Sequence, residues 1–158
     1  MCGISGLYSS LLSPVELQDS IELMSTTLIN RGPDSFGSFY DKSHGLALAH
    51  RRLSILELSD LGSQPMHSAC GRYVITFNGE IYNHTSLRNY LPPSFEWKSS
   101  SDTETLVNLI SVHGFHQALS MISGMFAFCV WDKLDKCLLL ARDRFGEKPL
   151  YYSLFDKT

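Results

Sequence analysis

The sequence predicts one α+β domain in which a mostly antiparallel sheet is covered by helices. Its 158 residues are 44% apolar and 18% charged, which fits a single globular domain. Short apolar segments alternate with turn-rich loops, and two longer segments carry apolar residues at helical spacing. No repeat or linker interrupts the chain, so we expect one domain over residues 1–158.

The amino-terminal half is expected to hold a strand, a helix and a hairpin. The strand should occupy residues 4–8. Residues 13–16, Ser-Pro-Val-Glu, combine an N-cap, a proline at the first helical position and a capping-box glutamate, so a helix should begin there and end before Pro33. The apolar segments 36–40 and 46–50 flank a turn-rich stretch and predict two paired strands.

The carboxy-terminal half is expected to add four strands and a second long helix. Residues 101–104, Ser-Asp-Thr-Glu, repeat the capping-box pattern, and Gly114 supplies a stop, which predicts the helix between them. A shorter helix capped by Asn83 should reach Leu91. The expected strands are the apolar segments 73–78, 125–131, 137–142 and 150–155.

Charge and cysteine usage exclude several classes of function. The 13 Lys and Arg against 16 Asp and Glu give a net charge of −3, which argues against nucleic-acid binding. No apolar run approaches the roughly 20 residues that span a bilayer, and no signal peptide is recognisable, so we expect no membrane association and a cytoplasmic location. The four cysteines form no C-x-x-C pair and the six histidines lack a ligand spacing, which predicts reduced thiols and no metal site.

Cys2 is the first candidate for chemistry. Removal of Met1 would place a thiol and a free α-amine on one residue. The reference pKa of a thiol is about 8.5 and that of an α-amine about 7.7–8.0, so the amine can accept the thiol proton near neutral pH. A Met-Cys start alone is weak evidence, since a cysteine occurs there by chance as well.

Asn78-Gly79 is the second candidate. A side-chain amide and an unobstructed backbone N–H are two donors that can stabilise the oxyanion of an acyl transfer. Asn-Gly is also the commonest hairpin turn, and that alternative stays open for this segment alone. The residues that follow, Glu80-Ile81-Tyr82, make a poor returning strand.

Arg52 and Asp102 supply opposite charges. A guanidinium can hold a carboxylate through two parallel hydrogen bonds, although a surface ion pair also explains the Arg51-Arg52 pair. Asp102 lies in the first turn of its expected helix, where capping alone explains a carboxylate. A cation, an anion, two oxyanion donors and a thiol can together bind and cleave a zwitterionic amide such as free glutamine.

Eight collinear segments resemble the class II glutamine amidotransferases, and in particular their asparagine synthetase branch. The segments are 1–4 (Met-Cys-Gly-Ile), 31–34 (Arg-Gly-Pro-Asp), 50–55 (His-Arg-Arg-Leu-Ser-Ile), 64–65 (Gln-Pro), 77–83 (Phe-Asn-Gly-Glu-Ile-Tyr-Asn), 101–104 (Ser-Asp-Thr-Glu), 124–128 (Gly-Met-Phe-Ala-Phe) and 142–152 (Arg-Asp-Arg-Phe-Gly-Glu-Lys-Pro-Leu-Tyr-Tyr). Each is weak alone, but together they span nearly the whole chain in order.

The resemblance implies a fold and an activity. The fold is the N-terminal-nucleophile hydrolase sandwich, four αββα layers with two mostly antiparallel sheets, whose last elements are expected beyond Thr158. The activity is hydrolysis of glutamine to glutamate and ammonia through a thioester on Cys2. In this family the ammonia passes to a carboxylate, aspartate in asparagine biosynthesis, that a downstream synthetase domain activates with ATP and Mg²⁺. The glutaminase domain itself is expected to need no cofactor, and a homodimer is left open.

The resemblance also implies residue roles. Cys2 is the nucleophile, and Asn78 and Gly79 form the oxyanion hole. Arg52 holds the α-carboxylate of glutamine, and Asp102 accepts from its α-ammonium. The remaining residues implied in the glutamine pocket are Leu53, Ser54, Ile55, Leu56 and Glu80.

Three alternatives remain at this point. The chain could be a non-catalytic glutamine-binding or scaffold domain, which retention of Met1 would favour. It could be an N-terminal-cysteine amidase for a larger amide, although Arg52 and Asp102 suit a free amino acid. It could also be an amidotransferase of the same type whose ammonia acceptor is a sugar or another carboxylate.

Overall fold

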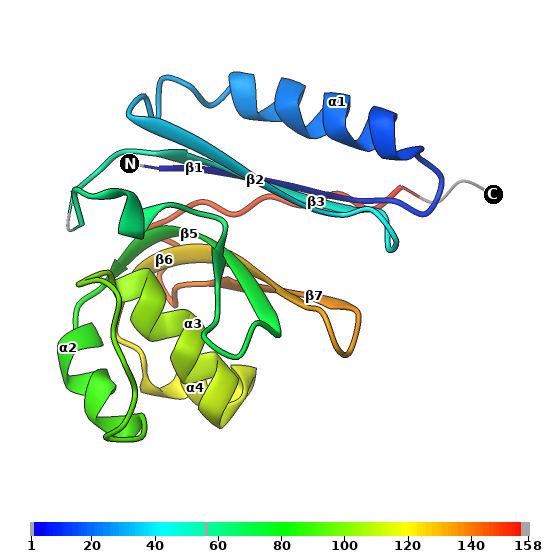
Figure 1. Ribbon diagram of the computed structural model, residues 1–158. Helices are drawn as coiled ribbons and strands as arrows, with labels where there is room; N and C mark the ends of the chain where they lie inside the picture. Colours follow the sequence, from blue (N-terminus) through cyan, green and yellow to red (C-terminus); the bar gives the residue numbers. More distant parts are fainter. Residues whose placement is uncertain (1, 56, 156–158) are drawn as a thin grey trace.

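The computed structural model describes residues 2–55 and 57–155, which fold into four layers (Figure 1). One sheet has the strand order β1-β3-β2, and the other has the order β4-β5-β6-β7, with every neighbouring pair antiparallel. The first sheet contains β1 (Gly3–Tyr8), β2 (Ser35–Asp41) and β3 (Leu46–Arg52), and the second contains β4 (Met66–His67), β5 (Tyr73–Ile81), β6 (Gly124–Asp132) and β7 (Cys137–Arg142).

Helices cover the outer faces of both sheets, as Figure 1 shows. The helix α1 (Pro14–Thr26) packs on the first sheet, while α2 (His84–Leu87), α3 (Asp102–His113) and α4 (Phe115–Met121) lie beyond the second. Two short 3₁₀ turns, η1 (Asp60–Gly62) and η2 (Arg88–Tyr90), complete the elements. This is the αββα sandwich of an N-terminal-nucleophile hydrolase, as the sequence predicts. Among the described residues, no helix has the length and apolar character that crossing a bilayer requires.

Three apolar clusters hold the layers together. Leu46, Leu48 and Val74 pack with Trp131 between the two sheets. The two outer clusters bind α1 to the first sheet and α3 and α4 to the second. Because β3 is covered on both faces, four consecutive residues from Leu46 are fully buried, which explains their unbroken apolar run.

Most expected elements are confirmed. The hairpin of β2 and β3, the strands β6 and β7 and the helix α3 all occur. The short helix expected up to Leu91 ends as an α-helix at Leu87 and continues as the 3₁₀ turn η2, and the Asn83 side chain makes no capping bond. The strand β5 continues through Asn78 and Gly79, which pair with Ala127 and Phe126 of β6. The hairpin-turn alternative for Asn78-Gly79 is therefore wrong.

Three features of the structure differ from the expectations. The first helix ends at Thr26, well before Pro33, because the chain turns at residues 27–31. The helix α4 was not predicted, since Gly114 was interpreted only as a stop, whereas at φ 81° it also links α3 to α4. Residues 150–155 form no strand, and the large side chains among them are mostly exposed.

The start of α3 differs in detail from the expected capping box. The Ser101 hydroxyl accepts from the Thr103 N–H at 3.1 Å, as an N-cap should. The Glu104 carboxylate instead accepts from the N–H groups of Lys98 and Ser99 at 2.9 and 2.8 Å. These bonds fix the segment that leads into α3, and with it the position of Asp102.

Candidate active site

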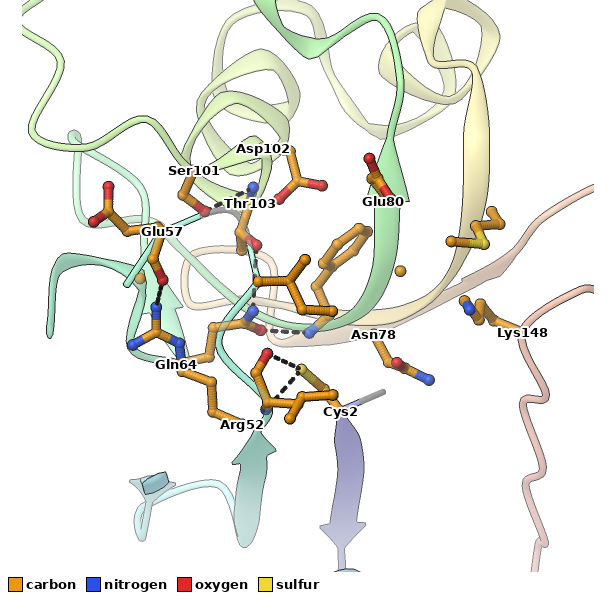
Figure 2. A pocket seen from close by; sticks show the side chains of 16 residues that line it. Cys2, Arg52, Glu57, Gln64, Asn78, Glu80, Ser101, Asp102, Thr103 and Lys148 are labelled. Carbon is orange, nitrogen blue, oxygen red and sulfur yellow. Dashed lines mark hydrogen bonds between the residues drawn. The ribbon is translucent and has the colours of Figure 1, made fainter. Parts of the chain in front are cut away.

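One pocket collects residues from separate segments of the chain (Figure 2). Cys2 lies just before β1, Arg52 ends β3, and Asn78 to Glu80 belong to β5. The lining residues are Cys2, Arg52, Leu53, Ile55, Glu57, Gly62, Gln64, Phe77, Asn78, Gly79, Glu80, Ser101, Asp102, Thr103, Met125 and Lys148. The structure thus brings together eight of the ten residues that the resemblance implies.

Two of the ten stand apart from this lining. Ser54 is not among the lining residues, and its N–H donates to Asp34 Oδ2 at 2.8 Å. This bond ties the chain after β3 to the segment 31–34. Leu56 lies outside the described residues.

The sulfur of Cys2 is held by the main chain after β3. The Leu53 N–H donates to Cys2 Sγ at 3.4 Å, and Sγ lies 3.6 Å from the Leu53 carbonyl oxygen (Figure 2). The guanidinium of Arg31 donates from Nε to the Cys2 carbonyl oxygen at 3.2 Å. The Cys2 thiol therefore lines the pocket while Leu53 contacts its sulfur and Arg31 holds its carbonyl oxygen.

The donors on β5 are arranged by strand alternation. Since successive N–H groups of a strand point to opposite edges, those of Phe77, Gly79 and Ile81 share the edge that faces away from β6. Gln64 accepts from Phe77 at 2.6 Å and Asp102 from Ile81 at 2.9 Å. The Gly79 N–H lies between them, and no described side chain accepts it.

Asn78 and Gly79 are both closely packed. The Asn78 side chain is 4% exposed, makes no hydrogen bond within the described residues, and lies on the same side of the pocket as Cys2 in Figure 2. A Cβ on Gly79 would collide with the Met125 carbonyl oxygen and lie 2.7 Å from Phe126 Cα. Only glycine fits this position against β6.

Arg52 is buried at the other side of the pocket. Its Nη1 donates to the Ser59 carbonyl oxygen at 2.8 Å, and its Nη2 donates to that of Glu57. The loop thereby uses two of the five N–H donors of Arg52. A side chain on Gly62 would collide with the guanidinium, so the loop needs glycine there to fold over Arg52.

Asp102 is a buried carboxylate facing the pocket (Figure 2). Burial raises the pKa of its carboxyl, while the N–H groups of Ile81 and Thr103 act in the opposite direction. A cation bound in the pocket would favour the ionised form. Asp102 and Arg52 thus provide an anion and a cation for the two charged groups of an amino acid.

Several lining residues were not assigned from the sequence. Gln64 and Lys148 lie within segments that carry the resemblance, but neither was given a role. Lys148 is 7% exposed, and its N–H donates to Asp143 Oδ2 at 3.0 Å. Glu57 fastens its loop to the start of α3 by accepting from the Ser100 N–H and hydroxyl at 3.1 and 3.0 Å.

The described residues contain no group of three or more His, Cys, Asp or Glu side chains arranged to hold a metal ion.

Comparison with known proteins extends over the whole sequence. The chain is 40% identical over 156 residues to asparagine synthetase [glutamine-hydrolyzing] 1 of Bacillus subtilis strain 168, which covers 97% of this chain and 24% of that protein. It is 35% identical over 151 residues to asparagine synthetase B of Escherichia coli K12, covering 96% of this chain and 26% of the relative. Amidase chry2 of Gibberella zeae is 35% identical over 167 residues, at 98% and 24% coverage.

The chain spans about a quarter of the length of these relatives. The model of the glutamine amidotransferase domain family matches residues 1–158, which include every element of the sandwich and the whole pocket. The chain belongs to the glutamine amidotransferase domain family.

Proposed function

We propose that this chain is the glutaminase half of a glutamine-dependent asparagine synthetase. In this proposal the pocket binds free glutamine and cleaves its side-chain amide, yielding glutamate and ammonia. The observation that carries it is the convergence of a thiol, two oxyanion donors, a cation and an anion, drawn from four distant segments, on one pocket. Family membership supports the same reaction class.

Substrate binding in this proposal uses the two charged side chains. The remaining N–H donors of Arg52 bind the α-carboxylate, and the Asp102 carboxylate accepts from the α-ammonium. Glu80 adds negative charge near that end of the pocket. The side-chain amide of the substrate then extends toward Cys2.

The proposed reaction begins after removal of Met1. The α-amine of Cys2 accepts the thiol proton, and the sulfur attacks the amide carbon of glutamine. The Asn78 amide and the Gly79 N–H donate to the oxyanion that develops. The proton passes to the departing nitrogen, ammonia leaves, and water hydrolyses the resulting thioester to release glutamate and restore the thiol.

An electrophilic glutamine analogue tests this proposal. The chain is incubated with the analogue, and intact mass and a peptide map are measured, with Cys2→Ala and Cys137→Ala as the matched pair of thiol variants. We expect loss of Met1 and one adduct on Cys2, which excess glutamine blocks and Cys137→Ala leaves in place. An unlabelled chain that retains Met1 would instead indicate a glutamine-binding or scaffold role, and glutamine hydrolysis at the wild-type rate by Cys2→Ala would refute the thioester.

The relatives extend well beyond the part that matches this chain, and they suggest what becomes of the ammonia. We propose that a synthetase domain in the same chain receives it, with aspartate as the carboxylate that ATP and Mg²⁺ activate there, and that the protein works in the cytoplasm. The names of the bacterial relatives support aspartate. Other relatives are named as amidases, so an ammonia acceptor other than aspartate is the second candidate. Asparagine formation from glutamine, aspartate and ATP by the full-length protein would decide between them.

A further inference from the structure

We propose that Gln64 is a positioning residue that sets the oxyanion donors of β5 at a fixed distance from the start of α3. The inference rests on the proposed glutaminase function and extends it to a residue outside the nucleophile, the oxyanion hole and the substrate-binding charges. Gln64 lines the pocket and is 8% exposed (Figure 2).

The amide of Gln64 bridges two walls of the pocket. Its Oε1 accepts from the Phe77 N–H at 2.6 Å, one residue before Asn78. Its Nε2 donates to Thr103 Oγ1 at 3.2 Å, one residue after Asp102. Both bonds are buried, so water competes poorly for these groups.

The bridge replaces a strand pairing that stops short. The strand β4 pairs with β5 only at Met66 and His67, opposite Ile75 and Val74. Continuing that register would place Gln64 opposite Phe77. The side-chain oxygen of Gln64 takes the position that a strand carbonyl would otherwise fill. The next N–H on the same edge of β5, that of Gly79, is open to the pocket.

A second hydrogen bond also joins β5 to the start of α3. Asp102 accepts from the Ile81 N–H at 2.9 Å, so β5 is fastened to the first turn of α3 at Phe77 through Gln64 and at Ile81 directly. The oxyanion donors lie between these two points. One amide serves both partners, because its oxygen accepts from the Phe77 N–H and its nitrogen donates to the Thr103 hydroxyl.

This arrangement predicts a specific kinetic signature. The groups that bind the two charges of glutamine do not depend on the bridge alone, since Asp102 keeps its bond to Ile81. The oxyanion forms only during the reaction, so displacement of Asn78 and Gly79 relative to Asp102 lowers kcat more than it raises KM. Substitution of a residue that only stabilised the fold would lower the melting temperature without a larger change in kcat than in KM.

The test uses three threonine variants in the natural chain that carries residues 1–158. Thr103→Val removes the hydroxyl that Gln64 binds, and Thr103→Ser keeps it. Thr105→Val is the matched control, because Thr105 is equally buried on the same helix but its hydroxyl accepts from Arg88 at 3.0 Å and donates to the Ser101 carbonyl at 3.3 Å, with no bond to Gln64. Glutamine hydrolysis and thermal unfolding are measured for each variant, and Thr103→Ala replaces Thr103→Val if the latter yields no folded protein.

We expect Thr103→Val to lower kcat about tenfold with KM changed less than threefold. Thr103→Ser should restore kcat, and Thr105→Val should lower the melting temperature with no split between kcat and KM. A kcat of Thr103→Val equal to that of the wild type, or equal losses in Thr103→Val and Thr105→Val, would overturn the inference while the glutaminase proposal stands. A wild-type protein that neither hydrolyses glutamine nor labels at Cys2 would overturn both.

Discussion

The two walls of the pocket are built in different ways. The strand wall consists of residues 77–81 of β5, which pair along their length with β6, and residues 101–103 at the start of α3, to which β5 is joined at Phe77 through Gln64 and at Ile81 through Asp102. The loop wall, residues 52–62, connects β3 to the region of β4, and its described residues after Arg52 form no helix or strand other than η1. Apolar side chains on the loop wall remain exposed, among them Ile55 at 66% and Leu58 at 76%.

The difference extends to single hydrogen bonds. In the strand wall both main-chain groups of Phe77 are bound by buried side chains, its N–H by Gln64 and its carbonyl by His50 Nε2 at 3.1 Å. Burial lowers the pKa of His50 to about 4, so the imidazole is neutral at neutral pH and donates to this carbonyl. The loop wall depends instead on polar contacts at its margin, made by Arg52 and Glu57.

This comparison separates two requirements of the proposed reaction. Donors to a developing oxyanion must be fixed before the reaction, and the strand wall fixes them through a sheet. The charges that recognise the two ends of an amino acid come from both walls, Arg52 from the loop wall and Asp102 from the strand wall. Substitutions at the oxyanion donors of β5 should therefore act on folding and kcat, and those at the two charges on KM.

Gly79→Ala should have the largest effect. The added methyl group would collide with β6, so we expect a loss of about 2 kcal/mol in the free energy of unfolding and at least a hundredfold loss of glutamine hydrolysis. Gly71→Ala is the control, because Gly71 has open space around it and only its positive φ disfavours alanine, at a cost of about 1 kcal/mol. Chemical denaturation and steady-state kinetics measure both, and an active, stable Gly79→Ala protein would show that the strand wall can adjust.

Arg52→Lys should have the next largest effect and should act through KM. Lysine cannot donate in parallel to a carboxylate and also hold two loop carbonyl groups, so we expect KM for glutamine to rise about tenfold or more while kcat changes little. Limited proteolysis should cut the loop wall faster in this variant. An unchanged KM would mean that another cation, such as Lys148, binds the carboxylate.

The roles expected of the site residues rest on the family resemblance, and the residues alone indicated only the elements that carry them. Arg52 ends an apolar strand and Asp102 starts a capped helix. The meeting of Gln64 with Phe77 was not predictable in this way, since it depends on where β4 stops in three dimensions. Residues 150–155 were misassigned because apolar composition favours a strand, whereas pairing requires a partner strand, and no described strand pairs with them.

The pH dependence of glutamine binding should report on Asp102. Its pKa is raised by burial, and the protonated acid cannot accept from an ammonium group as an anion does. We therefore expect KM to be constant near neutral pH, where the α-ammonium of glutamine is protonated, and to rise as the pH falls through the raised pKa of Asp102. Asp102→Asn should raise KM at neutral pH and abolish this dependence, as steady-state kinetics across a pH series would show. A wild-type KM that fell on acidification would have the wrong sign for an ionised Asp102.

Glu57→Gln should have the smallest effect and sharpens the assignment to Asp102. Hydrogen bonds from Ser59 and then Ser100 lower the pKa of Glu57 to about 2, so its contacts persist as the pH falls from neutrality and weaken only near that value. The amide side chain in Glu57→Gln has the same shape as the carboxylate and keeps one acceptor oxygen. We therefore expect KM for the substrate to rise about twofold to threefold with kcat unchanged. Because Glu57 stays ionised over the range where Asp102 titrates, the pH profile of KM in Glu57→Gln should run parallel to that of the wild type. If Glu57→Gln lost the rise in KM at acid pH, the titrating group would be Glu57 in the loop wall and not Asp102 in the strand wall.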